Sequence, residues 1–515
     1  MNKIVKGLLL GAISTGVASA YTNHTTLSLR SHGYNLARDF TTFNEMTGRR
    51  DDDTRGRSLQ LTGFYQASSG EKELGKYFGI SNHYSMLFGH AASGAVLSGA
   101  DLDSAYLIHE GAGDASQATV TLKPTSESYG VVLTSFSNLE KLMKGLYMST
   151  SIPLVHIKND MHMTVSNATG NATATNVFNY FNGTFTGIDS SSNAQLPLAY
   201  AKIDGMRSKT GIADIETKIG YNFLDEEDYR LGGNIGWTTP TGNCNKGTYV
   251  FQPIVGNGEH SALGLGFDGF VRVWGDERHN IKLAMVADYR FLFDNTEYRT
   301  FGLKKNDGTL RNWGHYHLLA RPQVGGANGA ILSPAANHTT LNCEVTPGSQ
   351  VEGLANIAYN NGGLSIDMGY NLFWREKEEV KIKGTYDTFS ELFGVANRAL
   401  SVADGSEAAS TYGNTAGTVD AGIFGTLERQ FDENAASTNT ANTAANMKWL
   451  TTANLDIDGA QTPSVLTHKI YAGVGYLFRE WYLPVMMGLG GSYELTSKNS
   501  TPDFWSVYGK LSIGF

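Results

Sequence analysis

The sequence predicts an all-β protein, a transmembrane antiparallel β-barrel of about twelve strands, and three observations support this. Apolar and polar residues alternate with a period of two through many separate segments, as in strands that face lipid on one side and a lumen on the other. Beyond residue 20, no apolar run reaches the roughly 18 residues that a membrane-spanning helix needs. Charged residues make up only 17% of the chain, which instead is rich in glycine, tyrosine and phenylalanine.

The segment 505–515 shows the clearest alternation. Every second residue in it is apolar or glycine, namely Trp505, Val507, Gly509, Leu511, Ile513 and Phe515. A strand that closes on a terminal phenylalanine resembles the assembly signature of bacterial outer-membrane barrels. The resemblance implies that Phe515 is an assembly signal read by the barrel assembly machinery. It also implies that the protein lies in the bacterial cell outer membrane, in contact with outer-membrane lipid.

The same alternation predicts twelve strands with an asymmetric set of connections. The expected strands are 58–68, 126–136, 142–156, 214–223, 229–237, 263–273, 281–291, 351–360, 364–374, 467–477, 481–495 and 503–515. Short turns at 137–141, 225–228, 275–279, 361–363 and 478–480 would face the periplasm, and long loops at 69–125, 157–211, 239–260, 295–350 and 376–466 would face outward. A further hairpin within 157–211 or 376–466 would raise the number to fourteen. The barrel with its loops would therefore occupy residues 58–515.

Two of the long connections have a composition that disfavours a packed structure. Residues 376–466 and 158–196 are rich in Ala, Thr, Asn, Ser and Gly, and their large apolar residues are scattered. We expect such segments to bury little surface, and to be mobile or folded onto the mouth of the barrel.

The beginning of the chain has the pattern of an export signal. Lys3 and Lys6 precede a short apolar stretch, and Ala18-Ser19-Ala20 fits a cleavage site, so residues 1–20 are predicted to be a signal peptide. Residues 21–57 would then form a periplasmic N-terminal segment that ends in alternating basic and acidic residues. This segment could fold into the lumen as a plug, or remain a solvated tail.

The inward face of the predicted strands carries charges of both signs. We expect the lumen to contain Asp214, Glu216, Lys218, Arg230, Asp268, Arg272, Lys282, Asp288, Arg290, Asp367 and Arg375. These groups could line a polar passage whose field orients small solutes. The alternative is that they pair across neighbouring strands and fill the interior, because a twelve-stranded barrel is intermediate between filled and open ones.

The sequence contains no recognisable catalytic, cofactor-binding or metal-binding motif. G-x-S-x-G, H-E-x-x-H and Walker A patterns are absent, so we expect no enzyme activity, no cofactor and no metal. A net charge of −9 argues against a nucleic-acid partner. Cys244 and Cys343 fall in consecutive loops on the same side, and they are candidates for a disulfide in an oxidising compartment; the alternative is two free thiols.

One hairpin resembles part of a known group of transporters. The strand Gly211-Ile212-Ala213-Asp214-Ile215 through Gly220-Tyr221, followed by a strand ending in Pro240-Thr241-Gly242, is similar to outer-membrane transporters for aromatic compounds. The layout is also similar to that of the long-chain fatty-acid transporters, although the Asn-Pro-Ala opening of that group is absent after Tyr21. This weak similarity to transporters of aromatic or hydrophobic compounds implies diffusion of a small solute without a cofactor.

Two functions follow as hypotheses from this sequence. The first is an outer-membrane channel or diffusion porin for small solutes. The second is a surface-exposed structural or adhesin barrel with a closed lumen, in which the long loops carry the function. The identity of the solute, the oligomeric state and the openness of the lumen do not follow from the sequence.

Overall fold

The computed structural model describes residues 56–90, 97–102, 104, 107–108, 115–170, 172–188, 194–304, 308, 310–321, 331–384, 394–395, 451–497 and 501–515. The predicted signal peptide, nearly all of the predicted periplasmic segment 21–57, and most of the loop 376–466 lie outside these residues. In the described part of the chain, no helix has the length and apolar character needed to cross a membrane.

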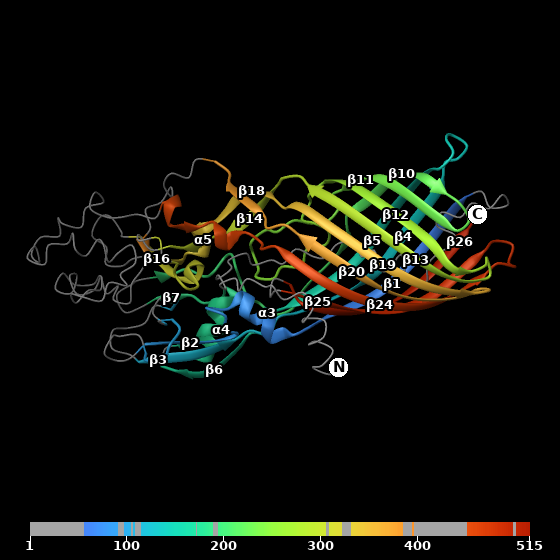
Figure 1. The fold of residues 1–515 in the computed structure, drawn as a ribbon. Coiled ribbons are helices and arrows are strands. Elements are labelled where there is room, and N and C mark those ends of the chain that lie inside the picture. Colours follow the sequence, from blue (N-terminus) through green and yellow to red (C-terminus); the bar gives the residue numbers. More distant parts are fainter. Residues whose placement is uncertain are drawn as a thin grey trace, which may run out of the picture.

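Twelve antiparallel strands form a closed barrel (Figure 1). They are β1 (Arg57–Ser69), β4 (Thr125–Asn138), β5 (Leu146–Asp160), β10 (Ile215–Asp225), β11 (Tyr229–Thr239), β12 (Ala262–Gly275), β13 (His279–Leu292), β19 (Gly348–Asn361), β20 (Leu364–Arg375), β24 (Val465–Phe478), β25 (Val485–Thr496) and β26 (Asp503–Gly514). Each strand pairs with its sequential neighbour in the barrel, and pairing of β10 with β5 completes the ring. The prediction of twelve strands is confirmed.

Two junctions close the wall of the barrel. β9 (Arg207–Ile212) and β10 pair with consecutive parts of β5, so together they act as one strand that is interrupted at Ala213 and Asp214. At the other junction β1 pairs with β26, and the backbone N–H of Phe515 donates to the carbonyl of Arg57 at 2.9 Å. Phe515 thus takes part in closing the barrel, whereas its role as an assembly signal stays a prediction.

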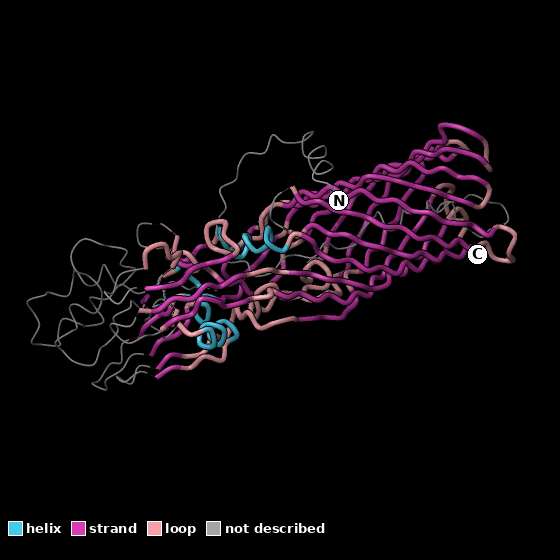
Figure 2. Tube along the Cα trace, turned by 90° about the horizontal axis from the view of Figure 1, so that it is seen from below, coloured by secondary structure: helices cyan, strands magenta, loops and turns pink. Residues whose placement is uncertain are grey.

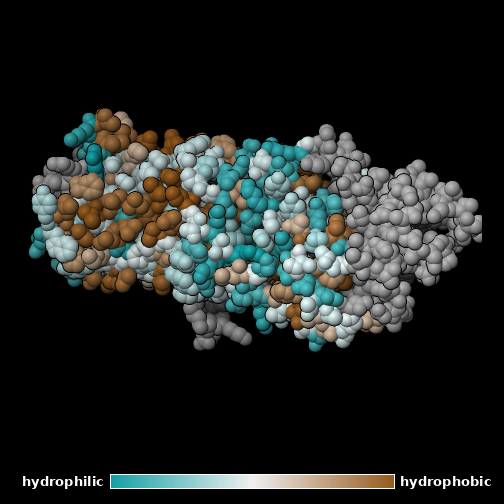
Figure 3. Space-filling model, turned by 180° about the vertical axis from the view of Figure 1, so that it is seen from behind, coloured by the Kyte–Doolittle hydropathy of each residue, from teal (hydrophilic) through white to brown (hydrophobic). Residues whose placement is uncertain are grey.

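The two faces of the wall differ in chemistry, as the alternation predicts. Outward side chains are large and apolar, and Met285, Leu489 and Met368 have exposed fractions of 69%, 68% and 60%. Figure 3 shows apolar side chains gathered over the barrel half of the molecule, and hydrophilic ones over the region next to it. A closed antiparallel barrel with an apolar outer band is the architecture of outer-membrane proteins, because only a closed barrel or a helix satisfies its backbone groups in lipid.

The connections are asymmetric between the two ends of the barrel. At one end the strands are joined by connections at 139–145, 226–228, 276–278, 362–363 and 479–484. At the other end the long connections leave the barrel and build a second folded region, here called the head (Figure 1). By the general asymmetry of such barrels, the head is extracellular.

The head contains several small sheets and short helices, and Figure 2 shows that the helices of the described residues lie in it. Its first layer comprises α3 (Glu71–Phe78), β2 (Ser85–His90), β3 (Ser116–Thr121), β6 (Thr164–Thr169) and α4 (Ala174–Asn182). A second sheet comprises β14 (Asn295–Thr300), β18 (Thr340–Thr346) and β21 (Glu379–Ile382), and α5 (Ala336–Thr339) directly precedes β18. A five-stranded sheet has the order β22 (Gly394–Val395), β16 (Leu318–Arg321), β17 (Ile331–Pro334), β8 (Ala194–Gln195) and β7 (Gly187–Ile188), and β15 (Gly302–Leu303) pairs with β23 (Leu455–Asp456).

The head has a hydrophobic core of its own, so the expectation that residues 158–196 bury little was wrong. Within α4, Tyr180 and Phe181 are 1% and 0% exposed. Phe181 makes edge contacts with Trp313 and Tyr316, with ring centroids 5.4 and 5.0 Å apart. The composition argument failed because a few aromatic residues from distant loops converge here, and each buries a large apolar area.

The lipid-facing assignment makes a direct prediction. Met285→Arg should destabilise the folded barrel by about 2–4 kcal/mol, because a guanidinium at mid-wall faces hydrocarbon. Met143→Arg is the matched control, since Met143 is exposed in a turn at the end of the barrel and the same change there should cost about 0–1 kcal/mol. Equilibrium unfolding in lipid vesicles measures both, and equal costs would contradict the assignment.

Candidate functional site

The eleven residues predicted to face the lumen all lie on the interior side of the barrel wall or at its edge. Glu216, Asp288, Asp367 and Arg375 are buried, whereas Lys218, Arg230, Asp268, Arg272, Lys282 and Arg290 are partly buried. Asp214 lies in the interruption between β9 and β10, where its Oδ2 accepts the backbone N–H of Asn257 at 2.6 Å. Their outward neighbours, such as Leu283 and Met285, are exposed.

Five of the interior charges form one connected network. Lys218 on β10 donates to Asp288 on β13 at 2.8 Å, and Arg290 on β13 donates to Glu216 on β10 at 2.8 Å. Lys218 also lies 3.9 Å from Glu216, and Arg290 lies 3.7 Å from Glu352 on β19. We call Glu216, Lys218, Asp288, Arg290 and Glu352 the lumen ion network.

The network joins two strands, β10 and β13, that are not neighbours in the barrel wall. β11 and β12 lie between them, so the paired side chains pass over the inner face of both strands. That face carries Gly236, Gly264 and Gly266 at this level. A Cβ at Gly266 would lie 2.2 Å from Asp288 Oδ1, and a Cβ at Gly264 would lie 3.4 Å from Arg290 Cγ. The glycines therefore provide the room in which the charges meet.

A second cluster repeats this arrangement closer to the short turns. Tyr147 on β5 donates its hydroxyl proton to Asp268 on β12 at 2.8 Å, and its ring passes over Gly220 on β10. Arg230 lies 3.3 Å from the other oxygen of Asp268. Arg230 and Lys282 both approach the ring of Phe270, at 5.3 and 5.1 Å from its centroid.

The sequence analysis missed several interior groups that the same alternation would have identified. Glu352 joins the network above, and Lys469 on β24 lies 3.0 Å from Glu494 on β25. Tyr471 donates to Asn356 at 2.9 Å. Lys510, which the alternation of 505–515 places on the polar face of the last strand, is buried on β26. Glu352 and Lys469 occupy inward positions of the expected strands 351–360 and 467–477, so the period of two is sufficient to identify them.

The interior is thus polar, largely buried and extensively paired. The charges pair between neighbouring strands, as in Arg230–Asp268, and also across two intervening strands, as in Lys218–Asp288. The network contains three carboxylates and two cations, so it carries one net negative charge. A polar solute that reaches the lumen ion network meets charged side chains that already have partners. To bind one of these side chains, the solute must displace its present partner.

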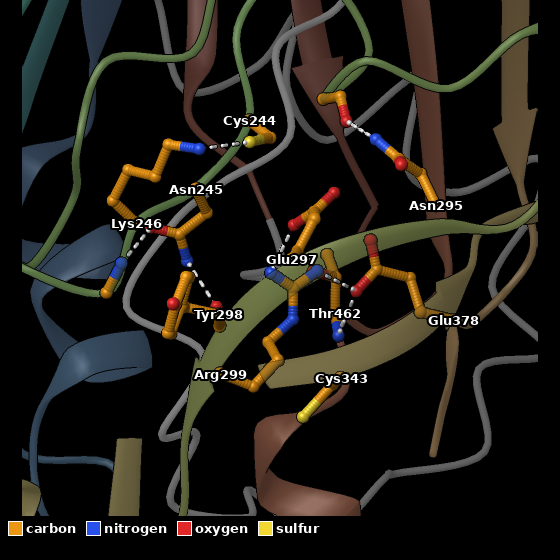
Figure 4. Close-up of polar contacts among 12 residues, drawn as sticks. Cys244, Asn245, Lys246, Asn295, Glu297, Tyr298, Arg299, Cys343, Glu378 and Thr462 are labelled. Carbon is orange, nitrogen blue, oxygen red and sulfur yellow. Dashed lines mark hydrogen bonds and ion pairs between the residues drawn. The ribbon is translucent and has the colours of Figure 1, made fainter. Parts of the chain in front are cut away.

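A third ionic cluster lies where the barrel meets the head (Figure 4). Arg299 on β14 is 2% exposed, and it pairs with Glu297 and with Glu378, whose Oε2 lies 3.0 Å from Nη2. The backbone N–H of Thr462 also donates to Glu378, at 3.1 Å. His260 places Nε2 2.8 Å from Glu297 and Nδ1 2.7 Å from the carbonyl of Phe293.

We call His260, Glu297, Arg299 and Glu378 the mouth cluster. Both carboxylates in it have partners, because Glu297 lies beside Arg299 and His260, and Glu378 pairs with Arg299. Buried charges are tolerated when they are paired in this way. Four segments meet here, namely the loop 240–261, β14, the residues after β20 and the residues before β24.

The disulfide predicted between Cys244 and Cys343 is not formed in the structure, where both thiols are free and buried. Figure 4 shows Cys244 and Cys343 on opposite sides of Arg299. Cys343 is on β18 directly across from Glu297, and it is 0% exposed, whereas Cys244 Sγ lies 3.1 Å from Lys246 Nζ. Consecutive loops do come together, but β18 orients Cys343 into the head core and away from the loop of Cys244.

Two histidines of the head, at positions 315 and 317, lie close together in the sequence. His315 and His317 are buried, and burial lowers the pKa of His315 to about 3, so its ring is neutral at physiological pH. His317 Nε2 lies 3.0 Å from the carbonyl of Asn312. Among the residues that the structure describes, no group of three or more potential metal ligands comes together.

Comparison with known proteins finds no matching family model and no matching curated protein. Among solved structures, an outer-membrane channel from Pseudomonas putida F1 is 11% identical with a TM-score of 0.37, covering 91% of this chain and 100% of its own. A FadL homologue of Pseudomonas aeruginosa is 7% identical with a TM-score of 0.31, covering 95% and 99%. The CymD monoaromatic hydrocarbon channel is 7% identical with a TM-score of 0.27, covering 95% and 98%.

The placement of the cysteines predicts how they react. Burial raises the pKa of the Cys343 thiol to about 12, and burial also raises the pKa of Cys244, so little thiolate forms at pH 8. We expect a maleimide to label neither thiol in the folded protein and both thiols after denaturation without reductant. Mass spectrometry counts the adducts, and a denatured, non-reduced protein that resists labelling would contain the disulfide.

Proposed function

We propose that this protein is an outer-membrane channel for small polar or charged solutes, with the lumen ion network as its constriction. The observation that supports this most directly is the network itself: opposite charges cross the inner face of β11 and β12 on a floor of glycines. Fixed charges of both signs in a narrow lumen produce a local field that orients dipolar and ionic solutes.

The chemistry of the constriction suggests the class of solute. A charged side chain of the network can leave its present partner and bind a carboxylate, an ammonium or a hydroxyl group of the solute. The lost ion pair is then replaced by another polar contact. An apolar solute offers no such replacement, and it would leave buried charges unpaired. The interior therefore favours polar or charged solutes over the hydrophobic compounds that the sequence resemblance implied.

The proposal predicts a change in ion selectivity when the charge of the network is changed. Glu216→Gln combined with Glu352→Gln converts the net charge from one negative to one positive. In planar bilayers with a salt gradient, the reversal potential should move toward anion selectivity, because the variant lumen attracts anions. The matched control is Glu226→Gln with Glu480→Gln, which removes two exposed carboxylates from the short turns.

The control should keep the reversal potential of the unmodified protein. Liposome swelling with sugars, amino acids and aromatic acids then identifies the solutes that pass. A complete lack of conductance in the unmodified protein and in the lumen variant would overturn the proposal, as would an equal shift in the control.

A second candidate is a surface barrel with a closed lumen, in which the head carries the function. The observation that favours it is the hydrophobic core of the head, which comprises residues from most of the long connections. A core of this kind gives the head a stable surface of its own. The absence of conductance described above, with normal folding, is the result that would favour this second function.

A further inference from the structure

The outer wall of the barrel has a recess of about 730 Å³ across β13, β19, β20, β24 and β25. The lining residues that point outward belong to two adjacent rows of cross-strand partners. The row nearer the head is Met285, Ala355, Tyr370, Ile470 and Tyr493, and the other row is Leu283, Ile357, Met368, Ala472 and Gly491.

The recess exists because small residues interrupt these rows. Ala472 and Gly491 are directly paired, and Ala355 lies between Met285 and Tyr370. Met368 on β20 is 60% exposed and Ile470 on β24 is 40% exposed, so large side chains rise beside a low floor. The lining is almost entirely apolar apart from groups near its edge.

Polar groups lie at the edge of the recess that faces the head. The hydroxyl of Tyr370 lies 2.5 Å from Nδ1 of His468, and the hydroxyl of Tyr493 lies 3.2 Å from Oγ of Ser69. Both tyrosines belong to the row nearer the head. The recess is therefore apolar along its length, with hydrogen-bonding groups at its extracellular end.

We propose that this recess binds one acyl chain of a membrane lipid, with the polar part of the lipid at Tyr370 and His468. The recess is continuous with the apolar outer band of the barrel, so lipid already surrounds it. A thin, flexible chain can fill a narrow depression, whereas the convex wall of a second barrel cannot enter it. The arrangement of apolar floor and polar edge matches the two parts of an amphiphile.

A lipid bound in the recess would have a defined position on the barrel wall, whereas other lipids around the barrel exchange freely with the bilayer. An acyl chain in the fluid bilayer has changing neighbours. When the chain lies in the recess, each of its methylene groups gains dispersion contacts with the side chains of the recess. A hydrogen bond from the carbonyl or headgroup region to Tyr370 would add a directional contact. This binding is independent of conduction through the lumen.

Filling the floor tests the proposal. Gly491→Leu places a side chain into the recess, and a Cβ at Gly491 would contact only Ser506 O, at 3.3 Å, so the wall can accommodate it. Gly63→Leu on β1 is the matched control, because Gly63 also faces outward, lies outside the recess and has open space around its Cβ.

The measurement is native mass spectrometry of the full-length protein, refolded in vesicles of palmitoyl-oleoyl-phosphatidylethanolamine and released into detergent. The unmodified protein and Gly63→Leu should retain one lipid, and the retained fraction in Gly491→Leu should fall at least about threefold. Unheated gel mobility reports folding, and Ala472→Leu replaces Gly491→Leu if the latter does not fold.

Several results would overturn the proposal. The unmodified protein could retain no lipid, or Gly491→Leu could retain as much as the control. A dimer that Gly491→Leu dissociates would show that a second copy occupies the recess, and an equal loss in both variants would show unspecific surface binding.

Discussion

The ion pairs that join β10 to β13 across the glycines of β11 and β12 are the interaction on which the interior of this barrel depends. Lys218–Asp288 and Arg290–Glu216 bring four charged groups into a space from which water is largely excluded. Buried charges are tolerated only when they are paired with good geometry. The glycines at 236, 264 and 266 follow from this requirement, because a side chain at Gly266 would displace the carboxylate of Asp288.

The same principle recurs where the barrel joins the head. Arg299 holds Glu297 and Glu378, and His260 ties the loop 240–261 to the same cluster. β13 ends at Leu292 and β14 begins at Asn295, so the strand carrying Arg290 continues almost directly into the strand carrying Arg299. The lumen network and the mouth cluster are thus anchored on one continuous stretch of chain.

Much of the barrel could be predicted from the sequence, because a wall that faces lipid imposes a strict period of two on every strand. That constraint located all twelve strands and placed Lys218, Asp288 and Arg290 together on the inner side. It could not predict which charges pair, because the pairs cross two intervening strands and depend on where glycines fall. Glu352 and Lys469 pair with Arg290 and Glu494 on adjacent strands, and their inward positions follow from the same period of two.

The head could not be predicted because its contacts have no period. Phe181 lies in one connection and Trp313 and Tyr316 lie in another, and only the fold shows that they meet. The disulfide between Cys244 and Cys343 was predicted from loop proximity alone. Proximity of two loops does not fix the direction of a side chain, and β18 directs Cys343 into the apolar core.

The most direct test of this account is a double-mutant cycle on Lys218 and Asp288. Lys218→Met, Asp288→Leu and the double variant are unfolded at equilibrium in lipid vesicles, and the coupling free energy is obtained from the three changes. The account predicts a favourable coupling of about 0.5–3 kcal/mol, as for residues in direct contact. Additive effects, within about 0.3–0.5 kcal/mol, would show that the two residues do not interact and would contradict it.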